Sequence, residues 1–339
     1  MGTVLLRLLD RWDEGRAVRG EQVKSVEDFS ISSELAFPQA GPGLSLDEFC
    51  GWAENAKADP AYYDLPAGYE ARIDAEDGWL RFPSAVRTGV PVNDRVTAKI
   101  THNGASQRAL IVFHHWNASS RQSALASYFS RTGLAVVEVA MPYHFERSRP
   151  GAAHADYMLS ANLGRTLQSL RQAVVDGRTV IRWLAERGFQ EIAVLGMSLG
   201  SWVAGLVAAH DPAVSKASLF LTADSLADMV WTGRATRAIR KGLEPAMDLS
   251  GLRVAWGPAD LGCYAQRLAR PDLNLHMVLA RRDTVVLPDL TRRFVRQLQA
   301  AGAEPVIKEL PCGHYSLALP PFGLMAGMSL KRFLEGDCS

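Results

Sequence analysis

The sequence predicts an α/β fold built on a mostly parallel, doubly wound sheet with antiparallel strands at its start. Short apolar runs alternate with helical patterns from residue 109 onward, a period-2 pair of strands precedes them, and 47% of the 339 residues are hydrophobic. Strands that alternate with helices form parallel sheets, and period-2 strands are typical of antiparallel pairs with one exposed face. A chain of this length holds one large domain or two ordinary ones.

Residues 1–75 are expected to form an N-terminal helical extension rather than an independent domain. A first helix is expected to carry its apolar residues on one side, and a second short helix covers 45–55. The apolar side of the first helix consists of Val4, Leu5, Leu8, Leu9 and Trp12. No catalytic motif occurs in this region.

Residues 76–339 are expected to form the main domain, which opens with antiparallel strands over 79–86 and 93–102. Further strands are predicted over 109–113, 134–140, 191–195, 216–221, 275–280 and 305–310. Helices are predicted over 122–132, 163–187, 199–209, 227–243, 290–301 and 322–334. Residues 224–270 interrupt the alternation between two strands, which is where a helical cap or lid is inserted.

The segment Gly196-Met197-Ser198-Leu199-Gly200 has the Gly-x-Ser-x-Gly pattern of a nucleophilic serine. An apolar strand precedes it and a helix of small residues follows it, which favours this interpretation over a tight turn with an incidental serine. Glycines two before and two after the serine remove side chains that would clash in the turn. The backbone N–H of Leu199 can then point at a developing oxyanion.

A serine needs a base and an acid that orients the base, and in such a fold they follow it in the chain. Asp283 follows the strand 275–280, and His314 follows the last strand behind a glycine. We therefore predict Asp283 as the acid and His314 as the base. Asp224 is a rival acid, because it also follows a strand, but the strand before Asp283 leads directly into the helix and strand that precede His314.

The loop 113–117 is expected to supply the second oxyanion donor. The backbone N–H of Trp116 is the candidate and His115 the alternative, while the plainer interpretation is that these side chains merely wall the pocket.

The pocket itself is expected to include four polar or aromatic residues. These are His115, Tyr143, His144 and Arg147. Arg147, with Arg149, could bind a carboxylate or phosphate, against the alternative of a solvated basic loop. The apolar residues 229–231 could form an acyl site, although such a stripe is more often core packing.

Net charge and cysteine content bear on the binding partners and on the cellular compartment. The 37 basic and 36 acidic residues give a net charge of +1, so no global attraction to nucleic acid is expected. The four cysteines are Cys50, Cys263, Cys312 and Cys338, far apart, and we expect them reduced in a cytoplasmic protein. No apolar run reaches the roughly 18 residues of a membrane span. No metal or organic cofactor is expected, and the oligomeric state is left open.

Residues 79–336 resemble the α/β-hydrolase superfamily. The resemblance rests on the Gly-x-Ser-x-Gly turn at 196–200, on Asp283 and His314, and on the loop at 114–116. The branch with dienelactone-hydrolase-like and prolyl-oligopeptidase-like esterases is most similar. The segments 141–147 and 227–233 resemble the α/β-hydrolase domain-containing 18 group. Two departures are His115, where many members have glycine, and Ser198, where dienelactone hydrolases proper have cysteine.

The resemblance implies a serine esterase with a Ser-His-Asp triad and an acyl-enzyme intermediate. The substrate would be a small-molecule acyl ester, and no cofactor would be needed. Two alternatives remain open at this point. One is an acyltransferase that uses the same triad, and the other is a non-catalytic binding protein on the same scaffold.

Overall fold

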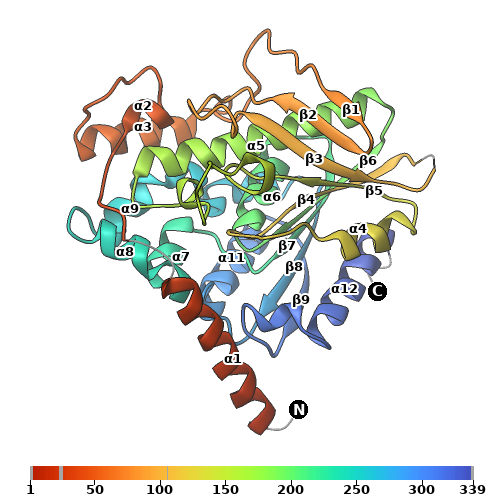
Figure 1. Ribbon diagram of the computed structural model, residues 1–339. Helices are drawn as coiled ribbons and strands as arrows, with labels where there is room; N and C mark the ends of the chain where they lie inside the picture. Colours follow the sequence, from red (N-terminus) through yellow and green to blue (C-terminus); the bar gives the residue numbers. More distant parts are fainter. Residues whose placement is uncertain (1–2, 23–25, 105, 337–339) are drawn as a thin grey trace.

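The computed structural model describes residues 3–22, 26–104 and 106–336, and it has a nine-stranded sheet with helices on both faces (Figure 1). The strand order is β1-β2-β3-β5-β4-β6-β7-β8-β9. The strands are β1 (Asp74–Glu76), β2 (Trp79–Pro83), β3 (Arg95–Thr101), β4 (Arg108–Phe113), β5 (Ala135–Val139), β6 (Glu191–Met197), β7 (Val214–Phe220), β8 (Asn274–Ala280) and β9 (Val306–Leu310).

The first strands pair antiparallel up to the β3–β5 contact, and all pairs from β5 to β9 are parallel. This confirms the predicted fold class. In β4, Ile111 and Phe113 pack into the core on one face, whereas Leu110 and Val112 pack into the core on the other. A central parallel strand is buried on both faces, which explains why its sequence is a continuous apolar run.

Helices α5, α6 and α11 pack in the core on one face of the sheet, and α4 and α12 pack in the core on the other (Figure 1). The helices are α1 (Thr3–Gln22), α2 (Ser33–Ala36), α3 (Leu46–Ala58), α4 (Ser123–Ser130), α5 (Leu163–Glu186), α6 (Leu199–His210), α7 (Leu226–Thr232), α8 (Arg237–Leu243), α9 (Leu249–Ala255), α10 (Ala265–Leu268), α11 (Pro288–Ala300) and α12 (Phe322–Glu335).

The segment between β7 and β8 is more helical and more broken than predicted. It contains α7 to α10, and the helix predicted over 227–243 is interrupted at Gly233. The chain is tight at this point, because a Cβ atom on Gly233 would lie 2.6 Å from the carbonyl oxygens of Met229 and Val285. Helix α9 lies within a part for which no helix was predicted. That this segment acts as a cap stays a prediction.

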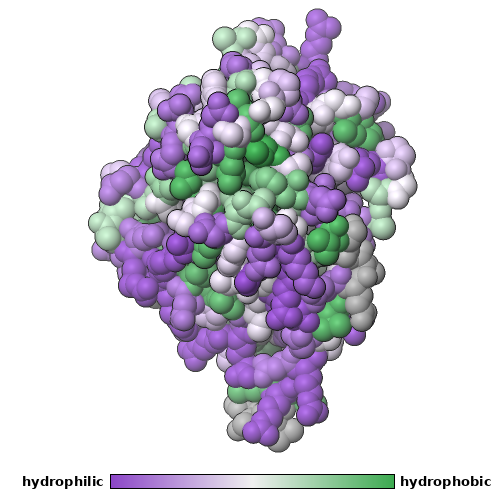
Figure 2. All heavy atoms as spheres, turned by 90° about the vertical axis from the view of Figure 1, so that its left-hand side faces the viewer, coloured by the Kyte–Doolittle hydropathy of each residue, from purple (hydrophilic) through white to green (hydrophobic). Residues whose placement is uncertain are grey.

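Helix α1 extends from Thr3 to Gln22, and the side that it buries is not its apolar side alone. Asp13 and Ala17 are buried, at 5% and 0% exposure, whereas Leu8 is 54% exposed and Trp12 is 36% exposed. Of the apolar side named from the sequence, Leu9 packs against the core, whereas Leu8 and Trp12 are exposed. The side chains of Val4 and Leu5 lie outside the described residues. The helix projects beyond the body of the molecule at its N-terminal end (Figures 1 and 2).

Cys50, Cys263 and Cys312 are free thiols, and Cys338 lies outside the described residues. Within the described ranges, no helix has the length and apolar character that crossing a membrane requires.

Candidate active site

Ser198 lies in a strained turn between β6 and α6. Its φ and ψ angles are 52° and −124°, a conformation that L-residues rarely adopt and that costs about 1–3 kcal/mol. The two neighbouring glycines make the turn possible. A Cβ atom on Gly196 would lie 2.2 Å from the carbonyl oxygen of Gly200, and one on Gly200 would lie 2.3 Å from that of Phe113. The predicted tight turn is therefore present, with the serine at its apex.

His314 links Ser198 to Asp283 through both ring nitrogens. Its Nε2 lies 3.0 Å from Ser198 Oγ, and its Nδ1 lies 2.8 Å from Asp283 Oδ2. A carboxylate has no proton to give, so Nδ1 carries the proton and Nε2 is left to accept the serine hydroxyl proton. The structure thus brings together the three residues that the sequence singled out from the ends of three strands.

Asp283 is held for this role by its own loop. Its Oδ1 accepts hydrogen bonds from the backbone N–H groups of Val285, at 2.7 Å, and Val286, at 2.8 Å. The rival acid Asp224 lies elsewhere, where its two carboxylate oxygens accept hydrogen bonds from Arg293 at 2.5 and 2.8 Å. Asp224 therefore serves an ion pair, and Asp283 faces the histidine.

The loop after β4 lies directly against the first turn of α6. A Cβ atom on Gly200 would lie 2.4 Å from the carbonyl oxygen of His114. The N–H of Leu199 belongs to the first turn of α6, where backbone N–H groups lack partners within the helix. The Trp116 side chain donates a hydrogen bond through Nε1 to Ala155 O at 3.0 Å. That Leu199 and Trp116 supply the oxyanion donors stays a prediction.

Two buried histidines shape this loop. His114 Nε2 accepts the Met141 N–H at 3.1 Å, and His144 Nε2 accepts the Asn117 N–H at 2.9 Å. Both rings must therefore be neutral, with the proton on Nδ1. Burial lowers the pKa of His114 well below its ordinary value and that of His144 to about 4.

Three of the four predicted pocket residues do not lie at a pocket surface. Tyr143 and His144 are 3% exposed and Arg147 is fully buried. The Arg147 guanidinium lies 2.9 Å from Asp176 and also donates to Asn93 O and Ala140 O. Their predicted role in contacting substrate is therefore wrong, because all three side chains are buried inside the protein. Asp176 lies far from Arg147 in the chain, so their pairing left no sequence signal.

His115 alone of that set is exposed. Desolvation by the surrounding protein and, second, the charge of His314 lower its pKa to about 4. The ring therefore borders the triad and is reachable from solvent, and its contact with substrate stays a prediction. A cavity of about 360 Å³ lies beyond Trp116, and its lining includes Arg149, Tyr157 and Ile239 but no triad residue.

Sequence reasoning missed one residue beside the triad. Asp13 of α1 accepts hydrogen bonds from the backbone N–H groups of Tyr315, at 2.7 Å, and Ser316, at 3.0 Å. Both residues directly follow His314. The only signal for it was an aspartate at the margin of the apolar stripe of a helix, one turn after Leu9, where a charged residue ordinarily lies in solvent.

No protein-family model and no curated protein matches the sequence. Among solved structures, the chain is similar to acetyl xylan esterase 1 from Thermoanaerobacterium sp. JW/SL YS485, with 17% identity over 99% of this chain and 98% of that one and a TM-score of 0.62. An acetyl xylan esterase from Paenibacillus sp. R4 is 15% identical over 90% and 98%, with a TM-score of 0.60.

An esterase from Pyrococcus furiosus is 15% identical, with 78% of this chain and 93% of that one covered and a TM-score of 0.51. The finer resemblance to the domain-containing 18 group is not confirmed by these structures. The likeness to acetyl xylan esterase 1 covers 99% of this chain and therefore includes its nine-stranded sheet. The chain has the α/β-hydrolase fold.

Proposed function

We propose that this protein is a serine hydrolase that cleaves small-molecule carboxylic esters through an acyl-enzyme intermediate. The observation that carries the proposal is the continuous hydrogen-bonded set Ser198, His314 and Asp283 at a strained strand-to-helix turn. A serine that serves only a turn needs no histidine at its hydroxyl and no carboxylate behind that histidine. The proposal that the substrates are esters is supported by the similarity of the fold to that of two acetyl xylan esterases.

The geometry supports a two-step acyl transfer. Ser198 Oγ attacks the ester carbonyl while His314 Nε2 takes the hydroxyl proton, and His314 then gives this proton to the leaving alcohol. In the second step water attacks the acyl-enzyme while His314 takes a proton from it; the bond between the acyl carbon and Ser198 Oγ then breaks, and His314 returns the proton to Oγ as the acid leaves. Asp283 keeps the proton on Nδ1 and stabilises the imidazolium that forms in both steps.

The oxyanion that develops on the carbonyl would be held by backbone N–H groups. Leu199 offers one from the start of α6, where the helix also presents its positive end. Trp116 is our candidate for the second, because its loop packs against the same turn. Loss of one such donor costs roughly 10²–10³ in rate.

The test is hydrolysis of p-nitrophenyl esters of increasing acyl length, combined with labelling by a fluorophosphonate. We expect turnover and a stoichiometric adduct in the native protein, and neither in Ser198→Ala. Ser123→Ala, an exposed serine of α4, is the matched control and should behave as the native protein does. Turnover that persists in Ser198→Ala would contradict the proposal, and turnover that requires an added alcohol would indicate an acyltransferase instead.

A further inference from the structure

Helix α1 reaches the catalytic histidine loop from the other end of the chain. We infer that Asp13 is a positioning residue for the base, which holds the loop that carries His314 without contacting the reacting atoms. The inference rests on the proposed function, since it gives Asp13 a part in the same reaction.

The Asp13 carboxylate is a buried acceptor at the centre of that loop. It is 5% exposed, and it accepts the N–H groups of Tyr315 and Ser316 on Oδ1 and the Ser316 hydroxyl on Oδ2 at 2.5 Å. All three donors belong to the two residues that follow His314. Hydrogen bonds to a carboxylate are stronger than those between neutral groups, so this side of the loop is firmly held.

The loop is also closed on the side that precedes His314. The N–H of Gly313 donates to Ser316 Oγ at 2.9 Å, which ties Gly313 to the same carboxylate through one hydroxyl. A Cβ atom on Gly313 would lie 2.5 Å from Asp13 Oδ2. The glycine therefore leaves room for the carboxylate, and both chain neighbours of His314 are fixed by Asp13.

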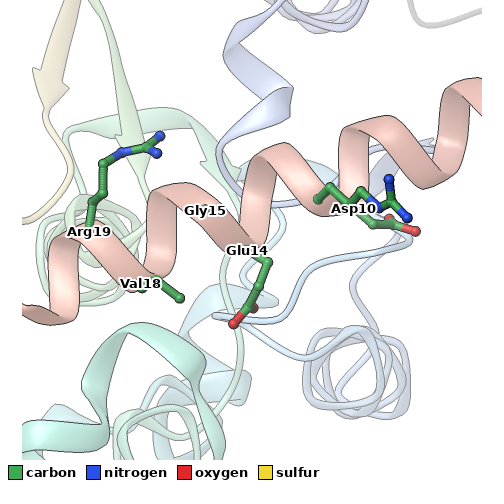
Figure 3. Close-up of a pocket in the computed structure, with 6 residues that line it drawn as sticks. Asp10, Glu14, Gly15, Val18 and Arg19 are labelled. Atoms are coloured by element: carbon green, nitrogen blue, oxygen red, sulfur yellow. The ribbon is translucent and has the colours of Figure 1, made fainter.

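Ion pairs hold α1 in the position from which Asp13 can act. Asp10 accepts from Arg282, which directly precedes the triad acid, at 2.6 Å, and Glu14 accepts from Arg234 at 2.9 Å. Asp10 and Glu14 also line a shallow groove of about 620 Å³. Figure 3 shows both side chains on this helix. The acidic side of α1 thus contacts the body, which explains why its apolar Leu8 faces solvent.

This arrangement matters for rate because a displaced base catalyses poorly. A misplacement of about 1 Å can cost roughly 10²-fold. The His314 ring is set by its Asp283 contact and by its own backbone, and the backbone of the next two residues is what Asp13 holds. Loss of Asp13 should therefore lower kcat and leave KM nearly unchanged.

The test compares Asp13→Ala, Asp13→Asn and Glu14→Ala in the full chain. Turnover of a p-nitrophenyl ester is divided by the number of sites that a fluorophosphonate titrates, so that misfolded protein does not count. We expect Asp13→Ala to lose about 10²-fold in kcat per site. Asp13→Asn keeps an acceptor oxygen for the two N–H groups and should lose roughly threefold. Glu14→Ala tests helix docking alone, because it removes one exposed ion pair of α1 while Asp10 still binds Arg282, and it should lose less than about twofold.

Two results would overturn the inference. One is a native kcat per site in Asp13→Ala, and the other is an equal loss in Glu14→Ala, which would mean that helix docking alone is measured. If Asp13→Ala does not fold, Ser316→Ala decides, because it removes the hydroxyl between Gly313 and Asp13. Its kcat per site should fall several-fold with KM unchanged, and a native value would refute the role of Asp13.

A double-mutant cycle adds a readout that a merely structural role would not give. Gly313→Ala should displace the carboxylate and lower kcat, but it should add little in the Asp13→Ala background, where the methyl group meets no carboxylate. Additive losses would contradict the proposed link. Ser198→Ala separates the two hypotheses: if it retains full activity, the proposed function and this inference both fail, whereas an inactive Ser198→Ala with a native Asp13→Ala removes only the inference.

Discussion

Polar side chains of similar kinds follow several strands of the sheet. Those after β6, β8 and β9 bond to one another near solvent, whereas those after β5 bond to groups inside the protein. In the first group, Ser198, Asp283 and His314 are bonded to one another at a turn that solvent can reach. In the segment after β5, His144 and Arg147 are turned inward and bonded to the backbone and to Asp176. A polar residue at a strand end is therefore not by itself a functional residue.

What separates the two groups is the partner. The buried side chains after β5 hydrogen-bond to groups that cannot take a proton from them. Arg147, for example, donates to the backbone carbonyl oxygens of Asn93 and Ala140. The Ser198 hydroxyl instead ends on a histidine that can take its proton.

The largest effect is expected for the acid. Asp283→Asn removes the acceptor that keeps the proton on His314 Nδ1, and such a change lowers kcat by about 10⁴. Asp224→Asn is the matched variant, because Asp224 also follows a strand but pairs with Arg293. It should lower stability and leave kcat per titrated site unchanged. Equal losses of kcat in the two variants would contradict the assignment of the acid.

The second effect concerns the buried ion pair. Arg147→Met leaves Asp176 buried without its cation, which costs about 3–5 kcal/mol in the free energy of unfolding. Urea denaturation measures this loss. Arg182→Met, at an exposed pair on the same α5 helix as Asp176, should cost under about 1 kcal/mol. A folded Arg147→Met protein should keep the native KM. A raised KM would mean that Arg147 contributes to substrate binding.

The third effect is a pH dependence of stability. Burial lowers the pKa of His144 to about 4, so the folded state disfavours a proton that the unfolded chain binds near pH 6.5. Its contribution is therefore complete above about pH 6.5 and is lost as the pH falls towards 4. The total is roughly 3 kcal/mol. Relative to native protein, His144→Asn should be less stable at pH 7.5, and the gap should narrow by pH 4.5 in urea titrations.

The smallest effect is expected within one loop. His114 is buried and His115, its neighbour, is exposed beside the triad. His115→Ala should change the unfolding free energy by less than about 0.5 kcal/mol. If the ring donates one hydrogen bond to substrate, KM should rise about two- to tenfold. A large loss of stability would mean that His115 has a structural role, as the buried residues after β5 have. An unchanged KM would mean that His115 does not contact substrate.

Much of the fold and the three triad positions could be predicted from the sequence because their signals are local. The strand β6, the turn at Ser198 and the helix α6 follow one another directly, and chain order then points to Asp283 and His314. The inward residues could not be recognised, because Arg147 meets Asp176 only after the sheet has formed. Asp13 was missed because its partners are backbone N–H groups and a hydroxyl at the far end of the sequence, whereas periodicity detects only the apolar side of a helix.

The contact between Asp13 and Tyr315 spans 302 positions of the chain. A polypeptide is made from its N-terminus, so α1 leaves the ribosome long before the partner that it holds. Since β8, β9 and His314 all follow Ser198 in the chain, a polypeptide that stops before His314 cannot present an ordered base to Ser198. Ester cleavage would therefore begin only after the residues up to Ser316 have been made and have met α1, and a product that ends earlier would be inactive.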